Sequence, residues 1–273
     1  MTYCVGIEVD EGLVFAADTR TSASFDDVRV YRKLHVFEYA GDRVLVMMSA
    51  GNLATTQLTI RRLLRDAEDP CATRSLRTFS HLDEVAGYVG EVMVSSQAKG
   101  GGDGQQKGVN VQSTFIFGGQ IAGQRPGLFM IYPLGNCIAT SPETPYLQVG
   151  ESKYGKPILD RIVRPHTALE DAARCALVSL DSTMRSNLSV GMPIDMVIVR
   201  KDDLRVTQRL RLEDDTPLYA EIHDSWSRKL EAAVHSLPRF PWEPPRAAQA
   251  AAGMPATTPS GRSPALIAED PPR

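Results

Sequence analysis

The order of strand-like and helix-like segments constrains the fold of this chain more than any other feature of its sequence. In the first fifty residues, short apolar runs alternate with turn residues such as Gly, Asp and Glu. This pattern predicts four short strands, at residues 3–9, 13–17, 35–39 and 43–49. The polar residues 18–33 are expected to form a loop between the second and third strands.

Helical periodicity replaces the strand pattern in two places. Apolar residues spaced three and four apart predict two helices before residue 104 and two more between residues 157 and 184. Strands are expected again at 113–117, 128–132, 146–149, 194–199 and 204–210, with a last helix at 218–234. Thr167 and Glu170 have the spacing of a capping box. The glycine-rich segment 99–104 is interpreted as a loop, because no Gly-Lys-Ser/Thr motif follows it that would favour phosphate binding.

The predicted order is therefore strands, two helices, strands, two helices, strands and one helix. A doubly wound parallel sheet needs strands and helices to alternate, so this order argues against it. Two antiparallel sheets stacked face to face, each with helices outside, would bury the apolar faces of these elements. The sequence thus predicts an α+β fold, a four-layer αββα sandwich, over residues 1–243. Residues 244–273 are rich in Pro and Ala, which predicts a disordered tail.

Composition limits the functions of such a chain. The 273 residues carry 30 Lys and Arg against 33 Asp and Glu, a net charge of −3, which argues against a basic nucleic-acid groove. No apolar stretch approaches the ~18 residues that cross a bilayer, so no membrane partner is expected. The four cysteines lack CxxC spacing and the five histidines lack HExxH spacing, so we expect no metal and no cofactor. Scattered cysteines without a secretory signal predict a cytoplasmic protein with reduced thiols.

Thr2 is the first candidate for chemistry, because it follows the initiator methionine. Aminopeptidases usually remove methionine before a small residue, so Thr2 is expected to become the N-terminus. An N-terminal threonine combines a hydroxyl nucleophile with an α-amine of pKa about 8 that can accept its proton. Removal of Met1 alone would expose both groups. Many proteins begin Met-Thr, so this pair indicates catalysis only together with other residues.

Asp18 and Lys33 strengthen this interpretation. Asp18 ends the second predicted strand, and Lys33 precedes the third. A lysine beside an amine and a hydroxyl favours their deprotonated forms, and an aspartate can be its counter-ion. Each residue also has a structural alternative: Asp18 as a turn cap, and Lys33 as a solvated lysine on an edge strand.

Several short motifs together make the chain resemble a known family. They are Met1-Thr2-Tyr3-Cys4-Val5-Gly6, Asp18-Thr19-Arg20, Arg32-Lys33-Leu34-His35-Val36-Phe37, Ser49-Ala50-Gly51-Asn52, Gly150-Glu151-Ser152-Lys153-Tyr154-Gly155 and Ser186-Asn187-Leu188-Ser189-Val190-Gly191. In this combination they resemble the β-subunits of the proteasome, and most closely Anbu, the bacterial ancestral beta subunit. The resemblance covers about residues 2–237. It implies an N-terminal-nucleophile hydrolase with the αββα fold.

The resemblance also implies roles for the matching residues. Thr2 would be the nucleophile and, through its amine, the general base. Lys33 would tune both groups, and Asp18 would anchor Lys33. The backbone N–H of Gly51 would stabilise the oxyanion, a contact that is worth roughly 3–4 kcal/mol in such sites.

Two serines are implied to contact the substrate. Ser22, by its place after Asp18 and Arg20, would pair with the substrate backbone. Ser49, which precedes the Ala-Gly turn, would line the primary specificity pocket, and its small side chain would leave that pocket roomy.

Two motifs depart from the pattern of proteasome β-subunits. Those subunits carry Gly-Ser-Gly where Gly150-Glu151-Ser152 stands here, and either Glu151 or Ser152 could take the place of the serine. Their Asp-x-x-Ser-Gly becomes Ser186-x-x-Ser189, so a serine replaces the aspartate and the amine loses a carboxylate neighbour. We therefore expect Ser186 and Ser189 near the amine, Ser152 near the substrate, and a weakened peptidase.

The function implied is threonine-type hydrolysis of peptides or related amides in a ring or open helical ring of identical subunits. Two alternatives stay open: hydrolysis of a small peptide-like amide metabolite, and a non-catalytic ring-forming scaffold with a degenerate site. An ATPase partner is also left open, because no docking motif for one is apparent.

Overall fold

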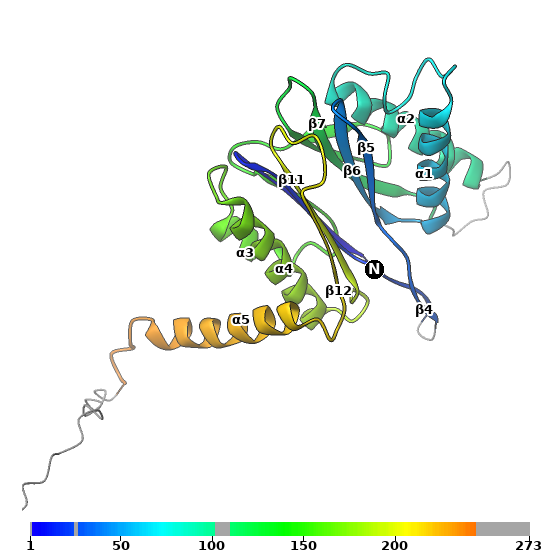
Figure 1. Ribbon diagram of the computed structural model, residues 1–273. Helices are drawn as coiled ribbons and strands as arrows, with labels where there is room; N and C mark the ends of the chain where they lie inside the picture. Colours follow the sequence, from blue (N-terminus) through cyan, green and yellow to red (C-terminus); the bar gives the residue numbers. More distant parts are fainter. Residues whose placement is uncertain (1, 25–26, 102–109, 244–273) are drawn as a thin grey trace, which may run out of the picture. The chain divides into compact units, whose positions relative to one another are not determined.

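The computed structural model describes residues 2–24, 27–101 and 110–243 (Figure 1). The chain divides into two units, Met1–Glu231 and Ala232–Arg273, and every residue discussed below as part of the site lies in the first. The predicted disordered tail, residues 244–273, and the end of the glycine-rich segment, residues 102–104, lie outside the described residues.

The first sheet carries the N-terminus of the chain. Its strands are antiparallel and follow the order β10-β1-β2-β11-β12. Their bounds are β1 (Tyr3–Val9), β2 (Gly12–Asp18), β10 (Tyr146–Gly150), β11 (Ile194–Arg200) and β12 (Gln208–Leu212). In the register of the sheet, Tyr3 lies opposite Gly150, and Cys4 lies opposite Ala17. Thr2 is therefore held directly in front of an internal strand.

The second sheet is also antiparallel, with the order β5-β6-β7-β8-β9. Its strands are β5 (Leu34–Tyr39), β6 (Arg43–Gly51), β7 (Ser113–Ile121), β8 (Gly127–Ile131) and β9 (Cys137–Ala139). A separate hairpin of β3 (Arg20–Ser24) and β4 (Asp27–Val30) follows β2. The two sheets bury apolar side chains on their inner faces, where residues such as Phe15, Val46 and Ile116 fill the space between them.

Two pairs of helices cover the outer faces. α1 (Leu53–Glu68) and α2 (Leu82–Gly101) pack on the second sheet through Leu63 and Val89. α3 (Lys156–Ile162) and α4 (Leu169–Ser186) pack on the first sheet through Leu159 and Leu180. The layers are helices, sheet, sheet and helices, as Figure 1 shows, which confirms the predicted αββα sandwich. The last helix, α5 (Pro217–Ser236), contacts the apolar cluster that contains Leu159 and Leu180 through partly buried residues near its start, such as Ile222.

The prediction of a loop at residues 18–33 was wrong, because β3 and β4 form a hairpin there. A two-stranded hairpin outside the sandwich needs no apolar face, so its polar sequence carries no strand signal. β9 was also not predicted. β12 begins at Gln208, four residues after its predicted start, because Asp202 and Leu204 take positive φ angles (70° and 48°) that belong to a turn.

The predicted capping box at α4 was wrong as well. The residue that precedes the helix is Ala168, whose side chain makes no capping bond, and Thr167 Oγ1 instead accepts the N–H of Arg164 (2.9 Å). The carboxylate of Glu11, from the turn between β1 and β2, accepts the N–H of Leu169 (3.2 Å). A side chain distant in sequence therefore serves the helix N-terminus that a local pattern had assigned to Thr167. Similarly, α2 continues through Gly101, beyond the predicted loop start at Lys99.

Candidate active site

Thr2 lies immediately before β1, and the backbone around it is held from two sides. Its carbonyl oxygen accepts a hydrogen bond from the N–H of Glu151 (2.8 Å), and the N–H of Tyr3 donates to Asp18 Oδ1 (3.0 Å). Tyr3 is fully buried, and its hydroxyl is hydrogen-bonded to Ser179 Oγ of α4 (2.6 Å). Thr2 itself is half-buried. The sheet thus fixes the predicted nucleophile while leaving part of it accessible.

Asp18 and Lys33 form a buried ion pair, and it touches the residue after Thr2. Lys33 Nζ lies 2.6 Å from Asp18 Oδ1 and donates also to the carbonyl oxygen of Arg20 (2.6 Å). The side chains of Lys33 and Asp18 are 6% and 0% exposed, which excludes the structural alternative of a solvated edge-strand lysine. Asp18 Oδ2 accepts the N–H of Gly191 at 3.4 Å. One carboxylate therefore joins the start of β1, the approach to β5 and the loop before β11.

The electrostatics of this pair follow from its burial. Burial raises the pKa of the Asp18 carboxyl, and the ammonium of Lys33 together with the N–H groups of Tyr3 and Gly191 opposes that rise. Cys4, which is fully buried beside the pair, has its thiol pKa raised by the same loss of solvent. A protonated and inaccessible thiol is a poor nucleophile, so Cys4 does not compete with Thr2.

Gly51 lies where β6 meets α1, and its conformation requires glycine. Its φ angle is +110°, and a Cβ atom there would lie 2.4 Å from the carbonyl oxygen of Gln112. Asn52 then begins the helix, because its Oδ1 accepts the N–H of Thr55 (3.0 Å). Gly51 is exposed, so the backbone predicted to meet an oxyanion is accessible.

Ser49 is buried beside the ion pair, at 6% exposure. Its N–H donates to the carbonyl oxygen of Lys33 (3.2 Å), and Cys4 Sγ lies 3.8 Å from its carbonyl oxygen. The structure thus brings Ser49 to the site, two residues before Gly51. Ser22 is placed by its backbone in β3, opposite Val28, and its side chain lies outside the described part of the structure.

A second group of hydrogen bonds reaches Thr2 from the opposite side and centres on Glu151. Glu151 Oε2 accepts the side-chain N–H of Asn187 (2.9 Å), and Asn187 Oδ1 accepts both the N–H and the hydroxyl of Ser189 (3.0 and 2.6 Å). Glu151 is 7% exposed, whereas Ser152 is half-buried. Of these two residues, Glu151 is therefore the one that the structure joins both to Thr2 and to Ser189.

Ser186 was expected near the amine of Thr2. It is the exposed last residue of α4, and within the described residues it makes none of the hydrogen bonds that join Glu151, Asn187 and Ser189. Asn187 follows it as the residue that ends the helix, with its N–H donating to the carbonyl oxygen of Thr183 (2.8 Å).

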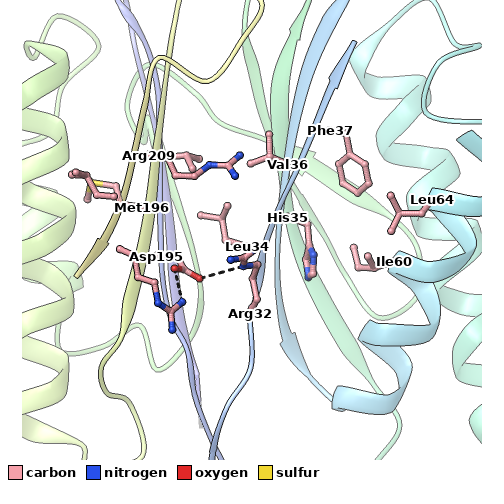
Figure 2. Close-up of a pocket in the computed structure, with 13 residues that line it drawn as sticks. Arg32, Leu34, His35, Val36, Phe37, Ile60, Leu64, Asp195, Met196 and Arg209 are labelled. Carbon is pink, nitrogen blue, oxygen red and sulfur yellow. Dashed lines mark hydrogen bonds and ion pairs between the residues drawn. The ribbon is translucent and has the colours of Figure 1, made fainter. Parts of the chain in front are cut away.

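A cavity of about 230 Å³ opens between β5 and the strands β11 and β12 (Figure 2). Its lining begins at Arg32, the neighbour of Lys33. Figure 2 shows Asp195 and Arg32 pointing toward one another, with 3.9 Å between Asp195 Oδ2 and Arg32 Nε. Arg211 donates to Asp195 Oδ1 (2.9 Å), and within the described residues Oδ2 accepts no hydrogen bond. Arg209 extends across the cavity toward Val36, also visible in Figure 2.

The lining of this cavity is positively charged. Three arginines, Arg32, Arg209 and Arg211, face one carboxylate, that of Asp195. His35 adds no charge at neutral pH, because burial and the nearby guanidinium of Arg32 lower its pKa to about 4. A ligand group with negative charge would be attracted to this cavity.

The part of the chain that the structure describes contains no helix long and apolar enough to cross a membrane. The same described residues contain no group of three or more His, Cys, Asp or Glu side chains that could hold a metal ion.

Comparison with known proteins decides the family. The model of the proteasome subunit family matches residues 2–199. The chain belongs to the proteasome subunit family. A structure of Anbu from Yersinia bercovieri is 41% identical and superposes with a TM-score of 0.81, covering 87% of this chain and 99% of its own. "Proteasome subunit beta 2" of Pyrobaculum calidifontis is 27% identical over 202 residues, which are 74% of this chain and 90% of the relative.

The chain is also similar to a second Anbu protein. A structure described as the helical assembly of the Anbu complex from Pseudomonas aeruginosa is 42% identical, with a TM-score of 0.83, and covers 88% of this chain and 98% of its own. Together with the Yersinia structure, it confirms the resemblance to Anbu that the sequence motifs indicated.

The link from Asn187 to Glu151 is the part of the site that sequence reasoning missed. The two residues are 36 positions apart, and nothing in either local sequence indicates a contact. Apart from that, the one signal in the sequence was Gly150, because glycine permits a turn in which one backbone segment approaches another closely.

Proposed function

We propose that the chain is a threonine-type N-terminal-nucleophile hydrolase that cleaves peptide or related amide bonds. The observation that carries this proposal is the Asp18 carboxylate, one oxygen of which binds both Lys33 and the N–H that follows Thr2. Folding alone gives little reason for such a group, because apolar residues of similar volume are often as stable as a buried ion pair. Chemistry at Thr2 gives a reason to retain it.

The reaction follows from the groups at Thr2 once Met1 is removed. Thr2 Oγ attacks the carbonyl carbon of the substrate, while its proton passes to the α-amine of the same residue, directly or through a water molecule. The substrate oxygen becomes an oxyanion that accepts the N–H of Gly51. The new ammonium gives its proton to the departing amine, which leaves an ester on Thr2. Water then attacks the ester carbonyl carbon while it gives a proton to the α-amine. The ester C–O bond breaks as the ammonium returns that proton to Thr2 Oγ, which frees the acid product.

Lys33 acts on this reaction by its charge. A fixed ammonium disfavours further positive charge nearby and stabilises negative charge, so it favours the deprotonated hydroxyl and the neutral amine of Thr2. Asp18 is the positioning residue, since it holds Lys33 Nζ at 2.6 Å in a pair whose side chains are buried.

We also propose that the chain works as a homo-oligomer. A groove of about 720 Å³ lies between α3, α4 and the part of α5 that belongs to the first unit. Its lining combines charged residues such as Asp171 and Arg174 with apolar ones: Ile158, Ile162, Val178, Ile222 and Trp226. Grooves of this kind on a soluble protein commonly mark contacts between proteins. The similar Pseudomonas protein was solved as a helical assembly, which supports a second copy of this chain as the partner. Light scattering of wild type and Trp226→Glu tests this, with a smaller particle expected for the variant.

The mechanism is tested by intact mass measured before and after an electrophile that traps N-terminal threonines. We expect wild type to lack one methionine and to gain one inhibitor mass. Thr2→Ala should assemble and remain unlabelled, and Lys33→Ala should also remain unlabelled. Labelling that survived in Thr2→Ala would overturn the mechanism. A retained Met1 would favour the scaffold alternative. If wild type is labelled, a panel of short peptides and small amidated metabolites then distinguishes the two enzyme alternatives.

A further inference from the structure

The turn Gly150–Glu151 is built to bring one acidic residue against Thr2. Gly150 has a φ angle of +87°, and a Cβ atom there would lie 1.9 Å from the carbonyl oxygen of Thr2. Only glycine permits this approach, which lets the N–H of Glu151 donate to the same oxygen at 2.8 Å. The amine and carbonyl of one residue are separated by its Cα alone, so the Thr2 amine lies within about 6 Å of the Glu151 backbone.

The carboxylate of Glu151 is held in place, but its negative charge is only partly balanced by neighbouring groups. The residue is 7% exposed, and its Oε2 accepts one neutral donor, the side chain of Asn187 (2.9 Å). Lys153 Nζ lies 3.5 Å from Oε1, but the Lys153 side chain is 68% exposed, so water screens much of this attraction. A buried carboxylate in this state is stabilised by a further cation nearby.

Asn187 is itself fixed, which gives the carboxylate one position. The hydroxyl and the N–H of Ser189 both donate to Asn187 Oδ1 (2.6 and 3.0 Å), so the amide of Asn187 presents its N–H₂ group to Glu151. Two residues further on, the N–H of Gly191 donates to Asp18. The loop 187–191 thus contacts Glu151 on one side of Thr2 and Asp18 on the other.

We propose that Glu151, positioned by Asn187 and Ser189, supplies the carboxylate that faces the α-amine of Thr2 and replaces the aspartate that proteasome β-subunits carry where this chain has Ser186. This inference rests on the proposed function, because it assigns a role to Glu151 in the same reaction. Ser186 is exposed at the end of α4, so the acid has moved from that helix to the turn after β10.

The expected effect is on the protonation of the amine. Among the described residues, the contacts around Thr2 bring in the paired Asp18 and Lys33 on one side, and Glu151 with the exposed Lys153 on the other. Arg20 adds a guanidinium that packs on Gly191 and donates to the carbonyl oxygen of Leu188 (2.9 Å) in the loop 187–191; it is unchanged in every variant compared below. A carboxylate near an amine favours the ammonium form, so Glu151 raises the basicity that Lys33 lowers. It also stabilises the ammonium that forms when Thr2 Oγ loses its proton to the amine. Glu151 is thereby a positioning residue that acts through the amine.

The test measures the amine directly and needs no substrate. Trace labelling of the full-length protein with acetic anhydride from pH 6 to 10, read on the N-terminal peptide by mass spectrometry, gives the apparent pKa of the Thr2 amine. Glu151→Gln removes the charge and keeps both a side-chain acceptor for Asn187 and the backbone N–H for Thr2. We expect it to lower the apparent pKa by about 1 unit, and Asn187→Ala to lower it by less.

The matched control is Glu143→Gln, which removes a carboxylate from an exposed position in the turn before β10. It should leave the titration unchanged, and Glu151→Asp should restore part of the shift that Glu151→Gln loses. Equal pKa values in wild type and folded Glu151→Gln would overturn the inference. If Glu151→Gln does not fold, an unchanged pKa in Asn187→Ala would overturn it instead. Loss of Met1 with normal threonine trapping would then leave the proposed function standing. A retained Met1 would overturn both, because no Thr2 amine would exist.

Discussion

Replacement of Lys33 by methionine tests whether the Asp18–Lys33 pair is buried and isolated in the way described above. Methionine keeps most of the volume of the lysine stem and removes its charge, which leaves the 0%-exposed Asp18 carboxylate without a cation. Breaking a buried pair from one side costs about 3–5 kcal/mol. Asp18 keeps the N–H groups of Tyr3 and Gly191, so we expect the lower end, about 3 kcal/mol. The double variant Lys33→Met, Asp18→Asn leaves no charge, and we expect it to recover most of this loss.

The pH dependence of the single variant follows from the same burial. Burial raises the pKa of Asp18 in the folded state, and in Lys33→Met no cation opposes that rise. A raised carboxyl pKa means that the folded variant binds its proton more tightly than the unfolded chain does. Its stability is therefore greatest at low pH and is lost as pH rises through the folded pKa. The difference from wild type should be small near pH 4 and largest above neutrality.

The assay is thermal unfolding of wild type, Lys33→Met, Asp18→Asn and the double variant. All are measured at one protein concentration, because the proposed self-association would make the midpoint concentration-dependent. For a domain of this size, about 3 kcal/mol corresponds to a lowering of the midpoint by roughly 6–12 °C. The reasoning is refuted if the double variant is less stable than Lys33→Met, or if Lys33→Met unfolds at the wild-type temperature. Either result would mean that the Asp18 carboxylate is not isolated from water.

Three further expectations concern single residues. The pKa of His35, about 4, lies below the ordinary value of 6.5, so its contribution to stability is present above pH 6.5 and lost as pH falls toward 4. In His35→Gln the unfolding midpoint should therefore depend less on pH between about 4 and 6.5. Gly51→Ala places a Cβ against Gln112 at φ +110°, so we expect destabilisation by about 1–3 kcal/mol and loss of threonine trapping, and a normal variant would contradict the strained turn. Tyr3→Phe removes a buried hydroxyl that Ser179 contacts at 2.6 Å, and urea unfolding should show a loss of about 1 kcal/mol or more; unchanged stability would contradict a role for this bond.

The layers of the fold could be predicted because periodicity is local. A strand with one inner and one outer face, or a helix with one apolar stripe, shows its period within ten to twenty residues. The predicted helices at α1, α2, α3, α4 and α5 are therefore present within a few residues, and so are the strands of both sheets except β9. The β3–β4 hairpin was not predicted for the converse reason. A strand pair outside the sandwich has no face to bury, so its sequence shows no alternation of apolar and polar residues.

Thr2, Asp18 and Lys33 were predicted as a group from their types and their places at strand ends. A threonine after the initiator methionine, an acid that closes one strand and a lysine just before another are unusual together, and the proposed function gives each of the three a role. What the sequence left undecided was the choice between Glu151 and Ser152 and the neighbourhood of Ser186. These depend on a turn in which Gly150 meets the Thr2 backbone, 148 positions away in the chain.

The sequence by itself determined the alternation of buried and exposed faces, and with it the layers, the strand that carries Thr2 and the residue types at the site. Only the tertiary structure decided which groups touch: that one oxygen of Asp18 serves both Lys33 and Tyr3, and that Asn187 holds Glu151. The physical reason is one of range. A burial pattern depends on residues that are close in the sequence. A hydrogen bond instead requires two groups within about 3 Å of each other, and strand register and loop closure decide which groups come that close.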